Sequence, residues 1–205
     1  MHSYVVFDLE TTGLSPVSSE IVEIGSWKIV DDVPVSKFCT LVKPRGYFSR
    51  DAQRISGITP DMLVDALEIE EILPSFIEYC ERLPLLGHNL PFDYEFVCRK
   101  AKSMGFDFTL KGERTGIDTL ALARKYYRNK SHKLEDMAKL FNINVPATKL
   151  GYHRAEYDSY ITKLIYDRFL ITSPTLPSVS VPNILGDPIN TIYGKAENYG
   201  TLSFG

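Results

Sequence analysis

Two carboxylates interrupt a hydrophobic stretch near the start of the chain, in the sequence VVFDLETTG. Asp8 and Glu10 are two residues apart, so on a β-strand their side chains point to the same face, about 7 Å apart along the strand. Two like charges on one face of a buried strand repel each other and lose water, which is costly unless a proton or a cation compensates. The pair therefore predicts a divalent metal site at the end of the first strand.

Other acids stand near the starts of two predicted helices. Asp93 follows the sequence GHNLPF, where a short strand ends and a helix begins, and such connections often carry functional groups. An acid in a first helical turn can also simply complement the helix dipole. In GYHRAEYDSY, His153 precedes the last predicted helix and Asp158 lies within it. On one helix these two would point about 140° apart, so they can converge only if His153 lies in the preceding loop.

Hydrophobic spacing predicts the elements that would position these groups. Strands are expected at 4–9, 20–30, 36–43, 83–87 and 117–120, and helices at 70–82, 90–104, 120–127, 133–141 and 155–171. The segment 44–60 is interpreted as a loop, and Asn89 as the cap of the helix that follows it. Strands followed by strands that alternate with helices favour an α/β domain with a mixed sheet.

From residue 172 onward the periodic pattern ends. This segment of 34 residues contains four prolines and few charges, and it is too apolar for a solvated linker and too irregular for a domain. We expect a catalytic-type domain over 1–171 and a C-terminal tail over 172–205.

The composition narrows the class of protein. Of the 205 residues, 44% are hydrophobic and 24% are charged, and the formal charge is −3, which argues against a generally basic nucleic-acid binder and leaves only local contacts with a polyanion. There is no apolar run of bilayer-spanning length and no signal-peptide pattern. The three cysteines, Cys39, Cys80 and Cys98, have apolar neighbours and are interpreted as buried. We therefore expect a cytoplasmic protein without membrane association.

The sequences FDLETTG, HNLPFD and HRAEYD occur in this order. They resemble the three motifs of the DEDDh branch of the DnaQ-like 3′–5′ exonucleases, a family that includes the proofreading epsilon subunit of bacterial DNA polymerase III. The resemblance extends over about residues 4–170, because DTLALARKYY and HKLEDMAKLF also look like the stretch between the last two motifs. It implies a ribonuclease-H-like α/β fold, in which helices flank a five-stranded mixed sheet.

The resemblance also implies the roles of the residues. Asp8, Glu10, Asp93 and Asp158 would bind two divalent cations, Mg²⁺ or Mn²⁺, and His153 would be the general base. Carboxylates suit these hard cations, whereas Zn²⁺ favours His and Cys, and a histidine titrates near working pH. The implied reaction is hydrolysis of the terminal phosphodiester of single-stranded DNA, which releases nucleoside 5′-monophosphates in proofreading or repair.

Two alternatives remain open on the sequence alone. The substrate could be RNA, as in RNA-trimming members of the same family, because the sequence does not reveal how a 2′-hydroxyl is treated. The chain could also be a non-catalytic module that docks on a DNA polymerase, with the tail as the contact. The presence of all five catalytic-type residues disfavours that second alternative.

The resemblance further implies substrate contacts in the turn after the first acids, at Thr11, Thr12, Gly13 and Leu14, and at Asn89. The alternative interpretation of the first four residues is a simple turn. Family members commonly carry His-Gly-Ile where this chain has Ser56-Gly57-Ile58, so a contact with the terminal base is in doubt there. The segment RKYYRNKSHK, residues 124–133, contains five Lys and Arg and no acid. It could follow nucleic-acid phosphates while an aromatic ring stacks on a base, or it could be a solvated helix end.

Overall fold

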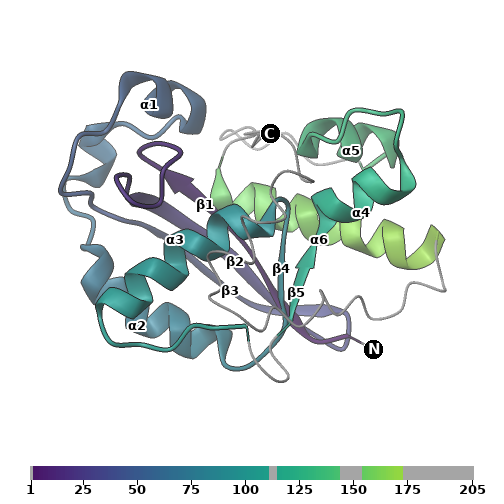
Figure 1. Cartoon of the computed structure of the whole chain (residues 1–205), viewed down its shortest axis with the longest axis horizontal. Helices are drawn as coiled ribbons and strands as arrows, with labels where there is room; N and C mark the ends of the chain where they lie inside the picture. The colour runs from purple at the N-terminus through teal and green to yellow at the C-terminus, as the bar shows by residue number, and fades with distance from the viewer. Residues whose placement is uncertain (1, 111–114, 144–153, 173–205) are drawn as a thin grey trace.

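The computed structural model describes residues 2–110, 115–143 and 154–172. The strands are β1 (Tyr4–Thr11), β2 (Ile21–Val30), β3 (Val33–Leu41), β4 (Leu85–Gly87) and β5 (Gly116–Asp118). The helices are α1 (Arg50–Ser56), α2 (Ile69–Cys80), α3 (Leu90–Ser103), α4 (Thr119–Tyr126), α5 (Leu134–Leu140) and α6 (Ala155–Thr172), with a 3₁₀ turn at Pro60–Leu63. Figure 1 shows these elements along the chain.

The strands form one mixed sheet in the order β3-β2-β1-β4-β5. β2 is antiparallel to both β1 and β3, whereas β1, β4 and β5 are parallel to one another. The tight turn from β2 to β3 passes through Asp31 and Asp32, both with positive φ. Because the carboxyl ends of parallel strands lie at the same edge of the sheet, this topology brings the residues that follow β1, β4 and β5 together. The predicted mixed α/β sheet with five strands is confirmed.

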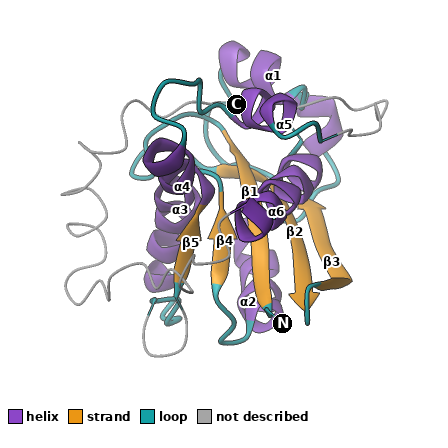
Figure 2. Ribbon diagram, turned by 90° about the vertical axis from the view of Figure 1, so that its right-hand side faces the viewer, coloured by secondary structure: helices purple, strands orange, loops and turns teal. Residues whose placement is uncertain are grey.

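Alternation along β1 gives the sheet two different faces. Val5, Phe7 and Leu9 pack with residues of α2 and α3, whereas Tyr4 and Val6 pack with residues of α4, α5 and α6. Figure 2 shows α6 across one face of the sheet and α2 behind the other. The even-numbered residues of β1 therefore face α6, and Asp8 and Glu10 continue that row.

The structure corrects the sequence interpretation at one helix, one cysteine and one strand boundary. The segment 44–60 contains the helix α1, which begins at the capping residue Ser49 and ends at Gly57. Cys39 is exposed, while Cys80 and Cys98 are buried as predicted. The predicted strand at 36–43 begins three residues earlier, at Val33.

Two further expectations concern the membrane and the tail. Among the described helices, none combines the length and the hydrophobicity needed to cross a bilayer. The predicted tail lies, apart from Thr172, outside the described residues. The boundary near residue 171 therefore stays a prediction.

Candidate active site

Three carboxylates from distant parts of the sequence converge at the end of β1. Asp8 and Glu10 come from β1 and Asp158 from the first turn of α6, and one oxygen of each lies within 4.8 Å of the others. Glu10 and Asp158 are buried, and Asp8 is partly exposed. A group of oxygen donors at this spacing suits one hard divalent cation or more.

Gly25 of β2 allows α6 to approach the sheet at this point. It pairs with Asp8 in the register of β1 and β2, and a Cβ atom at residue 25 would lie 2.0 Å from backbone atoms of Ala155 and Glu156. The first turn of α6 therefore rests directly on the β2 backbone. This contact places Asp158 beside the two acids of β1.

We expect Gly25→Ala to destabilise the chain by about 3 kcal/mol, because the added methyl group displaces the start of α6. The same displacement moves Asp158, so the stabilisation of the chain by added Mn²⁺ should also be lost. Gly105→Ala is the matched control: its φ of +81° is strained for alanine, but nothing lies within 4 Å of the added atom. In thermal melts with and without Mn²⁺, the control should lose about 1 kcal/mol and keep its stabilisation by Mn²⁺. Equal stabilisation of the two variants by Mn²⁺ would contradict the placement.

An ion pair between β2 and the residue before α6 also holds the start of α6 on the sheet. The sequence analysis missed this ion pair. Glu23 is paired with Glu10 across the two strands and is buried. Its carboxylate accepts hydrogen bonds from Arg154 Nε at 3.0 Å and Nη2 at 2.6 Å, and from the backbone N–H of Ala155 at 3.0 Å. Arg154 thus balances the charge of Glu23 next to the three acids and fixes the N-terminus of α6.

Asp93 lies beside the three converging carboxylates but is not one of them. It stands in the first turn of α3, is buried, and accepts a hydrogen bond from the backbone N–H of Leu9 at 3.1 Å. Leu9 lies between Asp8 and Glu10, so the hydrogen bond ties the start of α3 to the acidic end of β1. The predicted fourth acid is therefore next to the other three.

The electrostatics of the site follow from this crowding. Burial raises the pKa of Asp8 well above its usual range, and the charges of Asp93 and Asp158 raise it further. Burial and the charge of Asp158 likewise raise the pKa of Glu10, and burial raises that of Asp93. Carboxylates held in this way are costly when ionised together, and a divalent cation removes that cost.

Asn89 occupies the N-terminal cap position of α3, as predicted. It has a left-handed φ of 69° and its side chain makes no capping hydrogen bond, so the start of α3 is held through the backbone of Asn89. Its backbone N–H donates to Asp118 at 2.8 Å, and Asp118 also caps α4 by accepting from Leu120 N–H. Burial raises the pKa of Asp118 to about 6. The sequence analysis did not single out Asp118.

His88, directly after β4, has a structural role. Its Nε2 lies 2.9 Å from the carbonyl oxygen of His132, and its Nδ1 lies 2.8 Å from the hydroxyl of Thr119. Burial lowers the pKa of His88 to about 4, so the neutral ring donates to the carbonyl and accepts from the hydroxyl. The residue links the end of β4 to the segment between α4 and α5.

The turn after β1 leaves the side chain of Leu14 exposed to solvent. The Thr11 hydroxyl donates to Gly13 O, and the Thr12 hydroxyl accepts from Glu20 N–H, so both stabilise the turn. Leu14 is 52% exposed. Among the predicted contacts of this turn, Leu14 is thus the side chain most accessible to a ligand.

Two other predicted positions can be placed. Ser56 is buried at the end of α1, where its hydroxyl donates to Ala52 O and accepts from Ile58 N–H. It therefore does not replace the histidine that family members use at this position. His153 lies outside the described residues, directly before Arg154.

Comparisons with known proteins identify the family of this chain. The exonuclease family model of the RNase T type matches residues 5–166. The chain is 40% identical over 168 residues to DNA polymerase III PolC-type of Caldanaerobacter subterraneus subsp. tengcongensis, and 38% identical over 169 residues to that of Thermotoga petrophila. These matches cover 82% of this chain but only 11% and 12% of the relatives, so the chain spans about a tenth of their length.

Solved structures of exonucleases have a fold similar to that of this chain. Exonuclease X in complex with 5′-overhanging duplex DNA matches with a TM-score of 0.69 and 28% identity, over 86% of this chain and 96% of that one. E. coli exonuclease I in complex with a dT13 oligonucleotide matches with a TM-score of 0.75 and 19% identity, over 86% and 42% of the two chains. The predicted ribonuclease-H-like fold is confirmed. The chain therefore belongs to the exonuclease family, in the DnaQ-like group that its three sequence motifs resemble.

Proposed function

We propose that this chain is a metal-dependent 3′–5′ exonuclease that hydrolyses the terminal phosphodiester of single-stranded DNA and releases nucleoside 5′-monophosphates. The observation that carries the proposal is the convergence of Asp8, Glu10 and Asp158 within 4.8 Å, in a chain of the exonuclease family. A binding module has no need of buried acids that repel one another, because they cost stability.

The donor set suits two Mg²⁺ or Mn²⁺ ions. Every candidate ligand is a carboxylate, which these hard cations prefer. Asp8, Glu10 and Asp158 would hold them with Asp93, whose position is fixed by the hydrogen bond from Leu9 N–H. Such ions would supply positive charge to the anionic phosphodiester and to the departing 3′ oxygen, and would acidify an attacking water.

Residues around the acids supply the general base and the contacts with the terminal nucleotide. We assign the general base to His153, which takes a proton from the attacking water. Leu14, exposed at the turn after β1, packs against the terminal base. Thr11, Thr12 and Gly13 fix the turn, so that its backbone groups can hold the terminal nucleotide, and Asn89 adds a contact at the start of α3.

The relatives support DNA as the substrate. Those named above are DNA polymerases, and both solved structures are complexes with DNA. We place the activity in proofreading or repair, with residues 1–171 as the exonuclease domain and the tail 172–205 as a contact for a polymerase subunit. Loss of polymerase binding on truncation after Ile171, with hydrolysis retained, is the expected sign of that contact.

Digestion of matched DNA and RNA oligonucleotides tests the proposal. Wild-type protein with Mn²⁺ should shorten a 5′-labelled DNA oligonucleotide one nucleotide at a time and degrade the RNA more slowly, and EDTA should stop both reactions. A label at the 5′ end yields a ladder of shortened products only if removal starts at the 3′ end. Asp93→Asn keeps the acceptor for Leu9 N–H but loses the charge, so it is the inactive control.

Three results would contradict parts of the proposal. Faster digestion of RNA would reassign the substrate, because only the 2′-hydroxyl and the missing thymine methyl distinguish the two oligonucleotides. Full activity of Asp93→Asn would reject the metal ligands. Tight DNA binding without hydrolysis in Mg²⁺ or Mn²⁺ would favour the non-catalytic module.

A further inference from the structure

The segment that joins α4 to α5 carries an exposed group of positive charges. We define the basic loop as Arg128, Lys130 and Lys133, all of which are exposed. No acid occurs in the sequence between Asp118 and Glu135. Figure 1 shows α4 and α5 next to each other, alongside α6. In a chain of net charge −3, such a local concentration of cations needs an explanation.

Helix electrostatics do not explain the basic loop. Arg124 and Lys125 lie in the last turn of α4, where cations complement the dipole. Arg128 and Lys130 lie beyond that helix, and Lys133 occupies the N-terminal cap position of α5. A cation at a helix N-terminus is unfavourable because it opposes the helix dipole. Stabilisation of helix ends therefore does not account for the three charges of the basic loop.

Most of the prominent cations elsewhere have acidic partners. Lys28 pairs with Glu81, Lys37 with Glu156, Arg154 with Glu23 and Lys163 with Asp167. The acids that follow the basic loop, Glu135 and Asp136, lie near Lys139 at 3.7 and 3.8 Å. Within the described part of the chain, no ion pair involves a residue of the basic loop.

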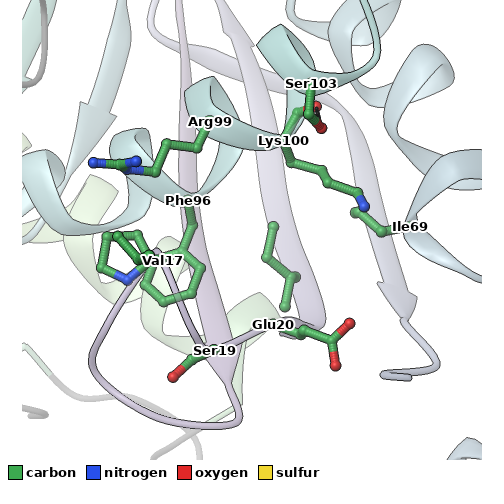
Figure 3. A pocket seen from close by; sticks show the side chains of 10 residues that line it. Val17, Ser19, Glu20, Ile69, Phe96, Arg99, Lys100 and Ser103 are labelled. Carbon is green, nitrogen blue, oxygen red and sulfur yellow. Dashed lines mark hydrogen bonds between the residues drawn. The ribbon is translucent and has the colours of Figure 1, made fainter. Parts of the chain in front are cut away.

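A pocket on the face of the sheet that α3 covers also contains cations, and it can be compared with the basic loop. It has a volume of about 330 Å³ and lies between the turn after β1 and α3. Figure 3 shows Arg99 and Lys100 among the side chains that line it. Arg99 pairs with Glu95 at 2.6 Å and Lys100 with Glu70 at 2.5 Å, so their charges are already balanced. The basic loop, not this pocket, offers cations to an anionic ligand.

The basic loop is firmly attached to the edge of the sheet that carries the acids. His88, directly after β4, lies 2.9 Å from His132 O, and His132 Nε2 lies 2.9 Å from Tyr127 O. The rings of Tyr126 and Tyr127 lie 6.4 and 6.0 Å from that of Phe169 in α6. Tyr127, whose ring also packs against Phe141 at 5.3 Å, therefore anchors the loop. Tyr126 is 40% exposed, so of the two rings only that of Tyr126 is accessible for the base stacking considered from the sequence.

We propose that the basic loop binds the phosphate backbone of the substrate strand upstream of its 3′ end. The inference rests on the proposed exonuclease function and extends it from the terminal nucleotide to the rest of the strand. Carboxylates at the cleavage site repel DNA, so a separate cationic contact at the same edge of the sheet is needed to hold the strand. Side-chain cations that contact phosphates bind without sequence preference and in a salt-dependent manner.

The double variant Arg128→Gln/Lys130→Gln tests the proposal. Its affinity for a fluorescent single-stranded 20-nucleotide DNA, measured by anisotropy in EDTA, should fall roughly 25-fold at 0.1 M monovalent salt. The slope of log K against log salt should become shallower by about 1.4, since each phosphate contact on a single strand contributes about 0.7. An RNA of the same sequence should respond equally, because the contact is with phosphates.

A matched variant, Arg82→Gln/Lys102→Gln, removes two exposed cations outside the basic loop. Its affinity and salt slope should stay at the wild-type values. Equal losses in the two variants would reveal an effect of net charge and overturn the proposal, as would an unchanged slope in the loop variant. Thermal melts of both variants should match wild type, because no described ion pair is broken.

A small substrate separates this proposal from the proposed function. The p-nitrophenyl ester of thymidine 5′-monophosphate has one phosphodiester and no upstream backbone, so the loop variant should hydrolyse it with unchanged kcat/KM. A loss of that activity would place the loop in the cleavage site and overturn the proposal. Absence of hydrolysis by wild type would reject the exonuclease function, while the binding slopes in EDTA would still decide the role of the loop.

Discussion

Asp8→Asn is expected to lower the rate of Mn²⁺-dependent DNA digestion by about 10³-fold, and at the same time to raise the melting temperature of the metal-free chain. The rate falls because the charge that would hold the cations is lost. The stability rises because Asp8 is a carboxylate whose ionised form is disfavoured by burial and by the charges of Asp93 and Asp158. Catalytic sites commonly carry this conflict between stability and activity.

The measurement is a single-turnover digestion assay combined with thermal melts in EDTA at pH 8. In a domain of this size, each kcal/mol of relieved repulsion raises the melting temperature by about 2–4 °C. Asp65→Asn is the control, because Asp65 is exposed; it should change neither quantity. Activity of Asp8→Asn within tenfold of wild type, or a lower melting temperature in EDTA, would contradict the site.

Sequence patterns predicted the parts of the fold that have strong periodicity. The strand with Asp8 and Glu10 has an apolar run and alternating faces, and both α2 and α3 extend over three turns or more, which makes their hydrophobic spacing clear. The short helix α1 was missed because Ser56 is its only fully buried residue. The sequence signals for α1 lie at its two ends. Ser49, at the N-terminal cap, accepts a hydrogen bond from Ala52 N–H, and Gly57, at the C-terminal cap, adopts a φ of 66°.

The sequence singled out the acids of the candidate site but not the residues that support them. Asp8 and Glu10 were identified from their spacing and Asp93 and Asp158 from their places near helix starts, whereas a common role as metal ligands came from the family motifs. Glu23 occupies an ordinary position in a strand, and its role depends on Arg154, which is 131 residues away. Asp118 fixes the backbone of Asn89 from a neighbouring strand. Contacts of this kind depend on strand order and register, which single-sequence patterns do not specify.

Mn²⁺ is expected to stabilise the chain more at alkaline than at acidic pH. A ligand that binds only the folded state adds about 2.7 kcal/mol at a concentration of 100 Kd, or about 5–10 °C in a domain of this size. Melts with Mn²⁺ and with EDTA, compared at each pH from 5 to 8.5, isolate this increment from other titrating groups. Asp158→Asn should lose most of the increment, and Asp65→Asn should keep it.

The direction of the pH dependence follows from the raised pKa values of Asp8, Glu10 and Asp93. Between the ordinary values of 3.8 for Asp and 4.5 for Glu and the raised values, the folded metal-free chain binds more protons than the unfolded chain. Its free energy of unfolding therefore falls as the pH rises through this window. Cations replace those protons, so the Mn²⁺ increment should grow over the same window and level off above it. An increment that is constant with pH would mean that Mn²⁺ binds elsewhere.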